Sequence, residues 1–526
     1  MFKKRKNECT EDWGLFETGK EYNYSLDLYS TVNRNERFYR GDQWSGVESD
    51  GLPKPVFNLF KRIIGYYISN IMQSRTAIRF NYASPFGNAG GVSQKEAESI
   101  TEVLNRIIEA KADKLKLNDL LYDALTDAAL SGDAVAYTYW DKSVKTGQPF
   151  TGDFKTVLVD NTNVFFGNPN SKNVQTQPYI LLSSRETVAS LIKAAKENGI
   201  PQSEISKIRA DDDTACQSGD MAAKELEGTK CTALIKLWKD ENGKVCYRKS
   251  VKNAVICPET KTPLSLYPVC FMNWTAVKNS WHGQAVATGL IDNQVFINKG
   301  FAMAMKHMMD TAFSKVVYDS TIIDRWTNKV GEAIAVNGSV DNVAKVLPAG
   351  QMQSGMLDLL SMAISHTKEF LGATDTALGD VDPKNTSAII ALQQASALPL
   401  ENIKRNLYTF AEAIGLVWLD FIFSYYDDMR LIEAGEQGYK ALPLSHYKNC
   451  LFDCRVEAGT ASYWSEIASL NTLDALLQTG KISLKQYLER IPDKLIPMKA
   501  ELLEEVESLP DEEAERKEHY DERTDL

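Results

Sequence analysis

Apolar residues recur every three to four positions through much of the chain, which is the period of a helix that buries one face. Residues 55–75 show this spacing clearly, with apolar side chains at Phe57, Phe60, Ile64, Ile68 and Ile71. The same pattern predicts helices at 21–44, 94–112, 118–131, 185–198, 354–372, 465–479, 483–490 and 493–507. Gly132 directly follows one of these patterns and is expected to end that helix, because glycine readily adopts the left-handed backbone found there.

A different texture, rich in β-branched and aromatic residues, dominates from 155 to 275 and predicts strands. The candidate strands are 134–140, 155–160, 178–183, 231–239, 244–250, 267–273 and 450–458. Asn242-Gly243 separates two of them, and this dipeptide is a strong signal for a tight hairpin. The two textures together predict an α+β fold that is mainly helical.

One helical pattern, 284–312, contains no proline and predicts a rod of roughly 40 Å. Its polar residues Asp292, Lys299, Lys306 and Asp310 fall on one stripe, at steps of seven, seven and four positions. The rest of its circumference is largely apolar, so this helix needs neighbours on several sides. Those neighbours are either the core of the same chain or the helices of adjacent subunits in a ring.

The region after this helix alternates short and long elements. Residues 313–350 are mixed, with strand-like pieces at 315–318 and 345–347, and a polar, turn-rich loop lies at 379–386. A long helical pattern then runs from about 387 to 427. Pro399 lies inside it and is expected to kink it, because proline cannot donate a backbone hydrogen bond.

The composition limits the partners and the compartment. The chain has 526 residues, of which 44% are hydrophobic, enough for about two to four structural units. Its 59 basic and 70 acidic residues give a net charge of −11, so it lacks the basic excess of a tight nucleic-acid clamp. Eight thinly spread cysteines fit a reducing compartment. No signal peptide and no membrane span are expected, since the chain shows neither an apolar N-terminal core nor a run of about 18 apolar residues.

Patterns that carry catalysis or bind metals are missing from the sequence. Residues 14–21 nearly match a phosphate-binding loop, but Glu21 stands where the loop needs a serine or threonine. Cys450 and Cys454 have no second pair or nearby histidine to complete a metal site. Asp427-Asp428 lacks the further carboxylates that a two-metal nuclease requires. We therefore predict no catalytic, cofactor-binding or metal-binding residues, and no enzyme.

The order of these features resembles the portal (head–tail connector) proteins of tailed double-stranded-DNA bacteriophages, over nearly the whole chain. In one patch the aromatic pattern Tyr39-x-Gly41-x-Gln43 leads into the apolar helix at 55–75. In another, Gln294 and Asn298 stand four positions apart within a long helix. That second patch spans 283–310, and further patches that resemble the family are 123–141, 379–392 and 471–491.

The resemblance implies a ring, usually of twelve subunits, at one vertex of the virion. The genome would be packaged and ejected through its DNA channel, and the packaging motor and then the tail or adaptor would dock onto it. The implied partners are other copies of the chain, double-stranded DNA, the terminase large subunit, head-completion or adaptor proteins, and the major capsid and scaffolding proteins. Neither a membrane nor a cofactor is implied, and assembly is expected in the host cytoplasm.

The parts of a portal subunit can be mapped onto this sequence through the resemblance. The expected parts are a wing (1–280), two stem helices (281–312 and 351–373), a small clip (313–350), a channel or tunnel loop (374–386), a long kinked helix with the return to the wing (387–460), helices of a crown (461–508) and a disordered tail (509–526).

A few polar residues within this map are candidates for contact with DNA or with partner proteins. Lys299 and Lys306 either face the channel or form ion pairs between subunits. The polar residues of the 379–386 loop either form a constriction against DNA or an ordinary turn; they are Asp380, Asp382, Lys384 and Asn385. In the clip, Lys315, Arg325 and Trp326 either bind the motor or adaptor, or Trp326 is buried in the clip.

Two other classes of function remain open at this point. A capsid or tail-tube protein is also a virion component, but it should be richer in strand and lack so long a helical stretch. A DNA-packaging enzyme would need the nucleotide-binding or metal-binding residues that the sequence does not show.

Overall fold

The structure is a computed structural model, and it describes the chain in part. The described residues are 2–48, 51–83, 94–148, 151–211, 229–312, 315–323, 334–337, 344–347, 354–370, 398–426, 431–433, 439–441, 444–458, 463–479, 481–491 and 502–503, with the single residues 325, 327, 339, 341, 343, 372, 496 and 499. The chain divides into two units, residues 1–72 with 77–457, and residues 73–76 with 458–526.

The first unit opens with a series of helices that cover its sheets. They are α1 (Phe2–Ser25), α2 (Leu28–Arg40), α3 (Leu59–Ile71), α4 (Gln94–Lys114) and α5 (Leu117–Ser131). The pattern at 55–75 is confirmed as α3, whose first turn is capped by the Asn58 side chain, which accepts a hydrogen bond from Lys61 N. Phe57 lies before this helix and is 52% exposed, so it does not belong to the buried face. Gly132 follows α5, as predicted.

Helix α1 differs from the prediction, which started the first helix at residue 21. The helical path breaks at Asp27, whose φ is 51°, so α1 and α2 are separate. The buried face of α1 consists of Cys9, Asp12, Phe16, Lys20 and Asn23, at steps of three and four. Because three of these five side chains are polar, a search for hydrophobic periodicity misses this helix. Residues 14–20, which resemble a phosphate-binding loop, lie within α1 and are helical.

Two antiparallel sheets form the centre of the first unit. The smaller sheet has the order β3 (Thr151–Val159), β2 (Asp133–Lys145), β9 (Val269–Asn273). The larger sheet has the order β4 (Val164–Phe166), β5 (Ile180–Thr187), β6 (Lys230–Lys239), β7 (Val245–Val251), β8 (Ala254–Lys261). The predicted hairpin at Asn242-Gly243 joins β6 to β7, with Gly243 at a φ of 73°. Strands β4 and β8 were not predicted.

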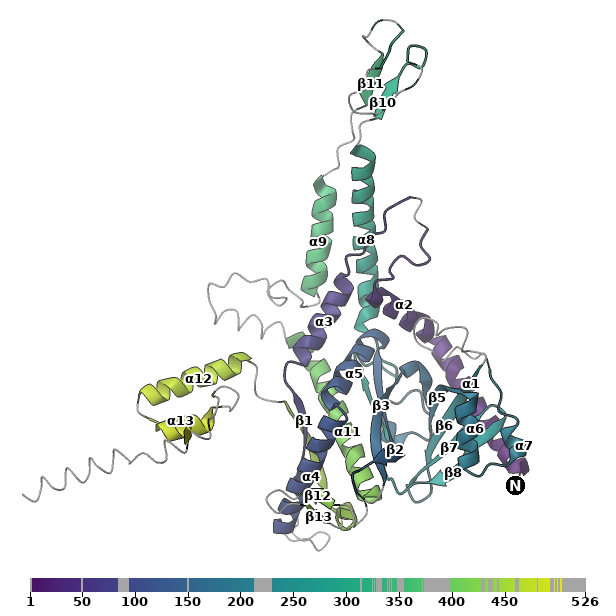
Figure 1. The fold of residues 1–526 in the computed structure, drawn as a ribbon, viewed down its shortest axis with the longest axis vertical. Coiled ribbons are helices and arrows are strands. Elements are labelled where there is room, and N and C mark those ends of the chain that lie inside the picture. Colours follow the sequence, from purple (N-terminus) through teal and green to yellow (C-terminus); the bar gives the residue numbers. More distant parts are fainter. Residues whose placement is uncertain are drawn as a thin grey trace, which may run out of the picture. The chain divides into compact units, whose positions relative to one another are not determined.

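Helices cover both faces of the larger sheet (Figure 1). On one face, Phe16 of α1 packs against Phe165, Leu181 and Leu234. On the other face, Leu191 of α6 (Val188–Glu197) packs among residues of β6, β7 and β8, with the short helix α7 (Gln202–Ile205) beside it. On the face that α1 covers, the polar residue Asp12 of α1 accepts two hydrogen bonds, of 2.7 and 2.8 Å, from the guanidinium of Arg248 on β7.

Helix α11 (Glu401–Tyr425) lies in the main core and follows a short 3-10 turn at Leu398–Leu400. By length and composition the helix could cross a membrane, but 61% of its most apolar stretch is buried inside the protein. Phe410, Ile414, Trp418 and Ile422 account for this, since each is almost completely buried. Pro399 lies in the short turn at the start of α11, and the residues before it, where a kink would show, lie outside the described residues.

Helices α8 (Val286–Thr311) and α9 (Ser354–Phe370) lie side by side and confirm two of the predicted helices (Figure 1). They approach closely at Gly300, where a Cβ atom would lie 2.9 Å from a methyl group of Leu360. Between them in sequence, β10 (Lys315–Tyr318) pairs with β11 (Ala344–Leu347), as the two strand-like pieces predicted. This pair lies beyond the C-terminal end of α8 (Figure 1).

The remaining strands form two further pairs. Strand β14 (Phe452–Ala458) pairs with β1 (Thr76–Tyr82), and β12 (Leu431–Glu433) pairs with β13 (Tyr439–Ala441). The second unit contains α12 (Tyr463–Gln478) and α13 (Leu484–Arg490). Helix α13 starts with a capping box between Ser483 and Gln486. The predicted helix at 493–507 and the tail at 509–526 lie almost entirely outside the described residues.

Candidate functional site: the root of helix α8

The polar stripe of α8 is confirmed as a set of helix positions, but its four residues differ in their surroundings. Lys306 Nζ lies 2.9 Å from Asp310 Oδ1, one turn further along the same helix. Asp292 Oδ1 lies 3.6 Å from an Nη atom of Arg34, on α2. Lys299 is exposed and makes no ion pair with any residue that the structure describes. Lys299 is therefore the residue of the stripe whose charge is still available.

The other predicted site residues are placed only in part. Lys315 is the first residue of β10, and Arg325 is exposed. Trp326 and the four loop residues Asp380, Asp382, Lys384 and Asn385 lie outside the described residues. The structure thus brings Lys299 and Lys306 together on one helix and leaves the clip and loop assignments as predictions.

A chain of buried amides attaches α8 to the N-terminal helices. Gln294 Oε1 accepts from Phe60 N at 3.0 Å, and Gln294 Nε2 donates to Asn298 Oδ1 at 2.9 Å. Asn298 Nδ2 in turn donates to Gln43 Oε1 at 2.6 Å, and Gln43 Nε2 donates to Phe38 O at 3.0 Å. All three amide side chains are at most 5% exposed. Each polar group is paired, so this chain fixes the orientation of α8 without a buried charge.

The sequence signalled half of this arrangement. Gln294 and Asn298 are four positions apart, so a helix places them on one face. Gln43 belongs to a different patch, more than 250 positions away, and only the fold brings it to Asn298. Two patches that were singled out for their resemblance to a family are therefore in direct contact.

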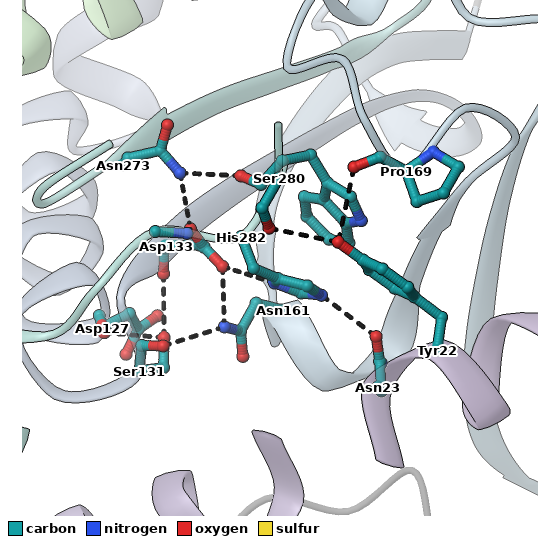
Figure 2. Close-up of polar contacts among 12 residues, drawn as sticks. Tyr22, Asn23, Asp127, Ser131, Asp133, Asn161, Pro169, Asn273, Ser280 and His282 are labelled. Carbon is teal, nitrogen blue, oxygen red and sulfur yellow. Dashed lines mark hydrogen bonds and ion pairs between the residues drawn. The ribbon is translucent and has the colours of Figure 1, made fainter. Parts of the chain in front are cut away.

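A buried carboxylate holds the segment that leads into α8, as Figure 2 shows. Asp133, at the start of β2, is 1% exposed. Its Oδ1 accepts from Asn273 Nδ2 at 2.8 Å and from the backbone N of Gly283 at 2.7 Å. Its Oδ2 accepts from Asn161 Nδ2 at 3.0 Å and lies 2.7 Å from Nδ1 of His282. Four partners surround one carboxylate, so its charge is well compensated despite burial.

His282 connects this carboxylate to helix α1. Its Nε2 lies 3.1 Å from Asn23 Oδ1. The centre of its ring lies 3.7 Å from that of Trp281 and 6.1 Å from that of Tyr22. Tyr22 itself lies within hydrogen-bond distance of Ser280, its hydroxyl oxygen 3.1 Å from the serine Oγ (Figure 2). Because both ring nitrogens have partners, the ring is held in one orientation. The residues just before α8 are thus fastened to α1, β2 and β9 together.

Several acidic side chains lie close together near the end of α5. The pKa of Asp127 is raised to about 7, because the side chain is largely removed from water and faces the carboxylates of Asp160, Asp123 and Glu36. Neighbouring carboxylates disfavour the ionised form of Asp127, and nothing among its described contacts suggests a substrate. The raised pKa is therefore a consequence of how the end of α5 is packed.

A cavity of about 520 Å³ opens between α2, the segment 43–47 and α8. Three cationic residues line it, Arg34, Arg37 and Lys299, together with the aromatic side chains of Phe38 and Trp44. None of the described residues that line it carries a carboxylate. Sequence reasoning missed this cavity, because its walls come from segments more than 200 positions apart.

The arrangement supports mechanical attachment rather than catalysis. Within the described residues, no group of three or more histidine, cysteine or acidic side chains is arranged to hold a metal ion. Cys450 and Cys454 are separate thiols and do not form a disulfide. What the root of α8 offers is a long helix with a rigid attachment, one available lysine and a cationic cavity.

The chain matches the model of one known protein family over its middle part. Residues 196–457 match the model of the family described as Phage P22-like portal protein. The matched region runs from the end of α6 to β14 and includes α8, the β10–β11 pair, α9 and α11. No curated protein matches the chain.

Proposed function

Since the chain belongs to the phage portal proteins, we propose that its ring forms the DNA channel at one capsid vertex, through which the genome is packaged and ejected. The family is structural and not enzymatic, and its members form homo-oligomeric rings in the virion. The packaging motor, with the terminase large subunit, would dock first, and the head-completion or adaptor proteins and the tail would follow. The major capsid and scaffolding proteins would surround the ring, which assembles in the host cytoplasm.

The single observation that carries this proposal is the family match across α8, β10–β11 and α9. In the proposed assignment, these elements would form the stem, at 281–312 and 351–373, and the clip, at 313–350. The wing would comprise 1–280 and 428–460. The second of these segments is the return within 387–460 that follows the long helix, and the crown would be 461–508. The tail at 509–526 lies outside the described residues.

The exposed apolar side chains of the stem support a ring. Large apolar residues are half exposed along both helices: Phe296, Met303, Met308 and Met309 on α8, and Leu357, Leu359 and Met362 on α9. A monomer would leave them in water, where a row of such side chains favours association. Contact with neighbouring stems would cover them on both sides.

The acidic net charge supports passage of DNA rather than tight binding. Affinity for a nucleic acid grows with each phosphate that a protein neutralises. A chain with a net charge of −11 and few cations on its stem would let the duplex slide. The channel loop, 374–386, would form the constriction through Asp380, Asp382, Lys384 and Asn385.

The stem lysines and the clip complete the proposed sites. Lys299 and Lys306 lie on one stripe of α8, which in a ring faces the channel or the boundary between subunits. In the clip, Lys315, Arg325 and Trp326 would bind the motor or the adaptor, because tryptophan and arginine are the residue types enriched in binding hot spots.

The test is the mass and shape of the purified chain. Native mass spectrometry should show a species near twelve times 58.8 kDa, and negative-stain microscopy should show rings with a central hole. A stable monomer or dimer at high protein concentration would contradict the proposal. Dominant strand content by circular dichroism would instead favour a capsid or tail-tube protein.

A further inference from the structure

The cavity at the root of α8 has the features of a binding site for an anionic group. Three cationic side chains line it, and no described lining residue is acidic. Arg34 and Arg37 each reach one exposed carboxylate, Asp292 at 3.6 Å and Asp42 at 3.2 Å, and neither carboxylate lines the cavity. Lys299 has no ion-pair partner among the described residues. An anionic group that enters the cavity would therefore meet up to three cations.

The cavity also has an apolar wall. Phe38, Trp44, Val47 and Val295 line it, and Val47 is 39% exposed. The indole nitrogen of Trp44 already donates to Pro55 O at 2.8 Å, so the ring offers its apolar surface rather than a donor. The occupant that suits this lining has a carboxylate next to aliphatic side chains.

Duplex DNA fits the cavity poorly. Three cations that converge on one concave site would hold a phosphate strongly, whereas translocation requires contacts that are weak and evenly spread. The sugar–phosphate backbone of DNA also lacks large aliphatic side chains that would fill the apolar wall. A protein side chain satisfies both halves of the lining.

Helix α9 carries a face with that chemistry. Leu360 is buried against Gly300 of α8. Asp358, Leu359 and Met362 lie on the other sides of α9 and are exposed, the last two at 54% each. Asp358 makes no ion pair with a described residue. An acidic residue flanked by exposed aliphatic side chains is what the cavity requires.

The two faces also lie at similar heights along the stem. Gly300 contacts Leu360, Lys299 is one residue from Gly300, and Asp358 is two residues from Leu360. At a helical rise of about 1.5 Å per residue, Lys299 and Asp358 differ in height by only about 4–5 Å. Rotation about a ring axis along the stem keeps these heights, so it can bring the α9 face of one subunit to the α8 face of the next.

We infer that the cavity is a socket for the neighbouring subunit of the ring, filled by the Asp358–Met362 face of α9 from a second copy of this chain. Asp358 pairs with Lys299 across the boundary, and Leu359 and Met362 cover Trp44 and Val47. Such a contact joins two different faces of the same chain, which is the type of interface that closes a ring. The inference rests on the proposed ring and assigns Lys299 to the boundary between subunits rather than to the DNA.

The test exploits the two different faces. Lys299→Glu and Asp358→Lys should each shift assembly to at least about tenfold higher protein concentration, since each places like charges in a partly buried contact. An equal mixture of the two variants should recover rings, because subunits that alternate restore an opposite pair at every boundary. Lys278→Glu, at an exposed lysine in a loop, is the matched control and should assemble as the wild type does.

Native mass spectrometry without DNA measures the assembly of the wild type, the two single variants, their mixture and the control variant, and circular dichroism checks that each variant is folded. Rings of Lys299→Glu at the wild-type concentration would overturn the socket while leaving the portal ring intact. Loss in both single variants without recovery in the mixture would overturn it too, because a defect within one subunit cannot be repaired by another. A wild-type chain that forms no ring would instead remove the proposed function, and the socket with it.

Discussion

At the scale of single residues, the decisive feature is the pairing of the buried carboxylate of Asp133 and of the buried amides of Gln43, Gln294 and Asn298. Asp133 accepts from Asn273, Asn161 and Gly283 N, and it contacts His282. A carboxylate with no such partners would be too costly to bury. Asp133 therefore loses its contact with water but is held in a fixed geometry by its partners. This suits a helix that must keep its direction in an assembly.

Asp133→Asn should be strongly destabilising. An asparagine keeps the shape but replaces one acceptor oxygen with an NH2 group that faces donors, so the cost should be about 3–5 kcal/mol of unfolding free energy, as for a broken buried pair. Urea denaturation followed by circular dichroism measures it.

Asp141→Asn is the control for that substitution. Asp141 pairs with Lys155 at the surface (2.8 Å), where ion pairs contribute little, so this variant should denature almost as the wild type does. Equal urea midpoints for the Asp133 and Asp141 variants would show that the buried network is not important for stability.

At the scale of elements, the junction between α5, β2 and the segment before α8 depends on one glycine. Gly132 has a φ of 98°, and its carbonyl oxygen accepts from Trp274 N at 2.9 Å. A Cβ atom at this position would lie 2.5 Å from Gly283 O. Both the backbone conformation and the space require glycine here, so the end of α5 and the start of α8 are built against each other.

Gly132→Ala should lower the thermal midpoint by more than a positive φ alone explains. The left-handed conformation costs an alanine about 1–2 kcal/mol, and the contact with Gly283 O adds to it because a backbone atom cannot move aside cheaply. Gly147→Ala is the matched control, since Gly147 has a φ of 75° and open space around it. Thermal denaturation that gives the same midpoint for both variants would exclude the predicted clash.

Helix α1 shows why some elements escape sequence patterns. Its buried positions follow helical spacing, yet Asp12, Lys20 and Asn23 are polar. Arg248 satisfies Asp12 and His282 lies against Asn23, and both partners are more than 200 positions away. A helix that buries polar residues against distant partners cannot be recognised from the apolar residues in its own segment.

At the scale of the whole molecule, the main core belongs to the first unit. Its buried members run from Phe38 to Leu444, and the last side chain that packs against it is Val456. None of the described residues from 459 onwards contributes to it. The first unit therefore has a complete core without the helices of the second unit.

A chain that ends at residue 460 should keep a cooperative thermal transition. Because the core is complete, the midpoint of thermal unfolding should change by no more than about 2–4 °C. A shift of that size corresponds to a change of about 1 kcal/mol in the unfolding free energy of a domain of roughly 150–250 residues. Differential scanning calorimetry measures it.

A chain that ends at residue 449 is the control for this truncation. It lacks β14, whose Phe452 ring lies 5.8 Å from Phe423 and 5.9 Å from Tyr82, and it should unfold at a much lower temperature. If the chain that ends at residue 460 showed no cooperative transition, the first unit would not fold without the second.

The identity of the chain was accessible from the sequence to a useful degree. The predictions of a portal protein and of a mainly helical α+β fold are confirmed, and membership in a structural family supports the expectation that the chain is not an enzyme. The family match covers 196–457, so it includes the patch around Gln294 and Asn298 but not the one around Gln43. The site residues proposed from the resemblance stay predictions.

What the sequence by itself determined was local. Helices such as α3 and α8, the Asn242-Gly243 hairpin and the end of α5 at Gly132 follow from periodicity, turn chemistry and backbone freedom, which depend on residues close together in the chain. Tertiary structure alone decided which polar groups meet: Gln43 with Asn298, Asp133 with Gly283, and the two arginines of α2 with Lys299 around one cavity. The physical reason is that a hydrogen bond or a cavity depends on positions in space, and segments 150 to 265 residues apart carry no local sign of being neighbours.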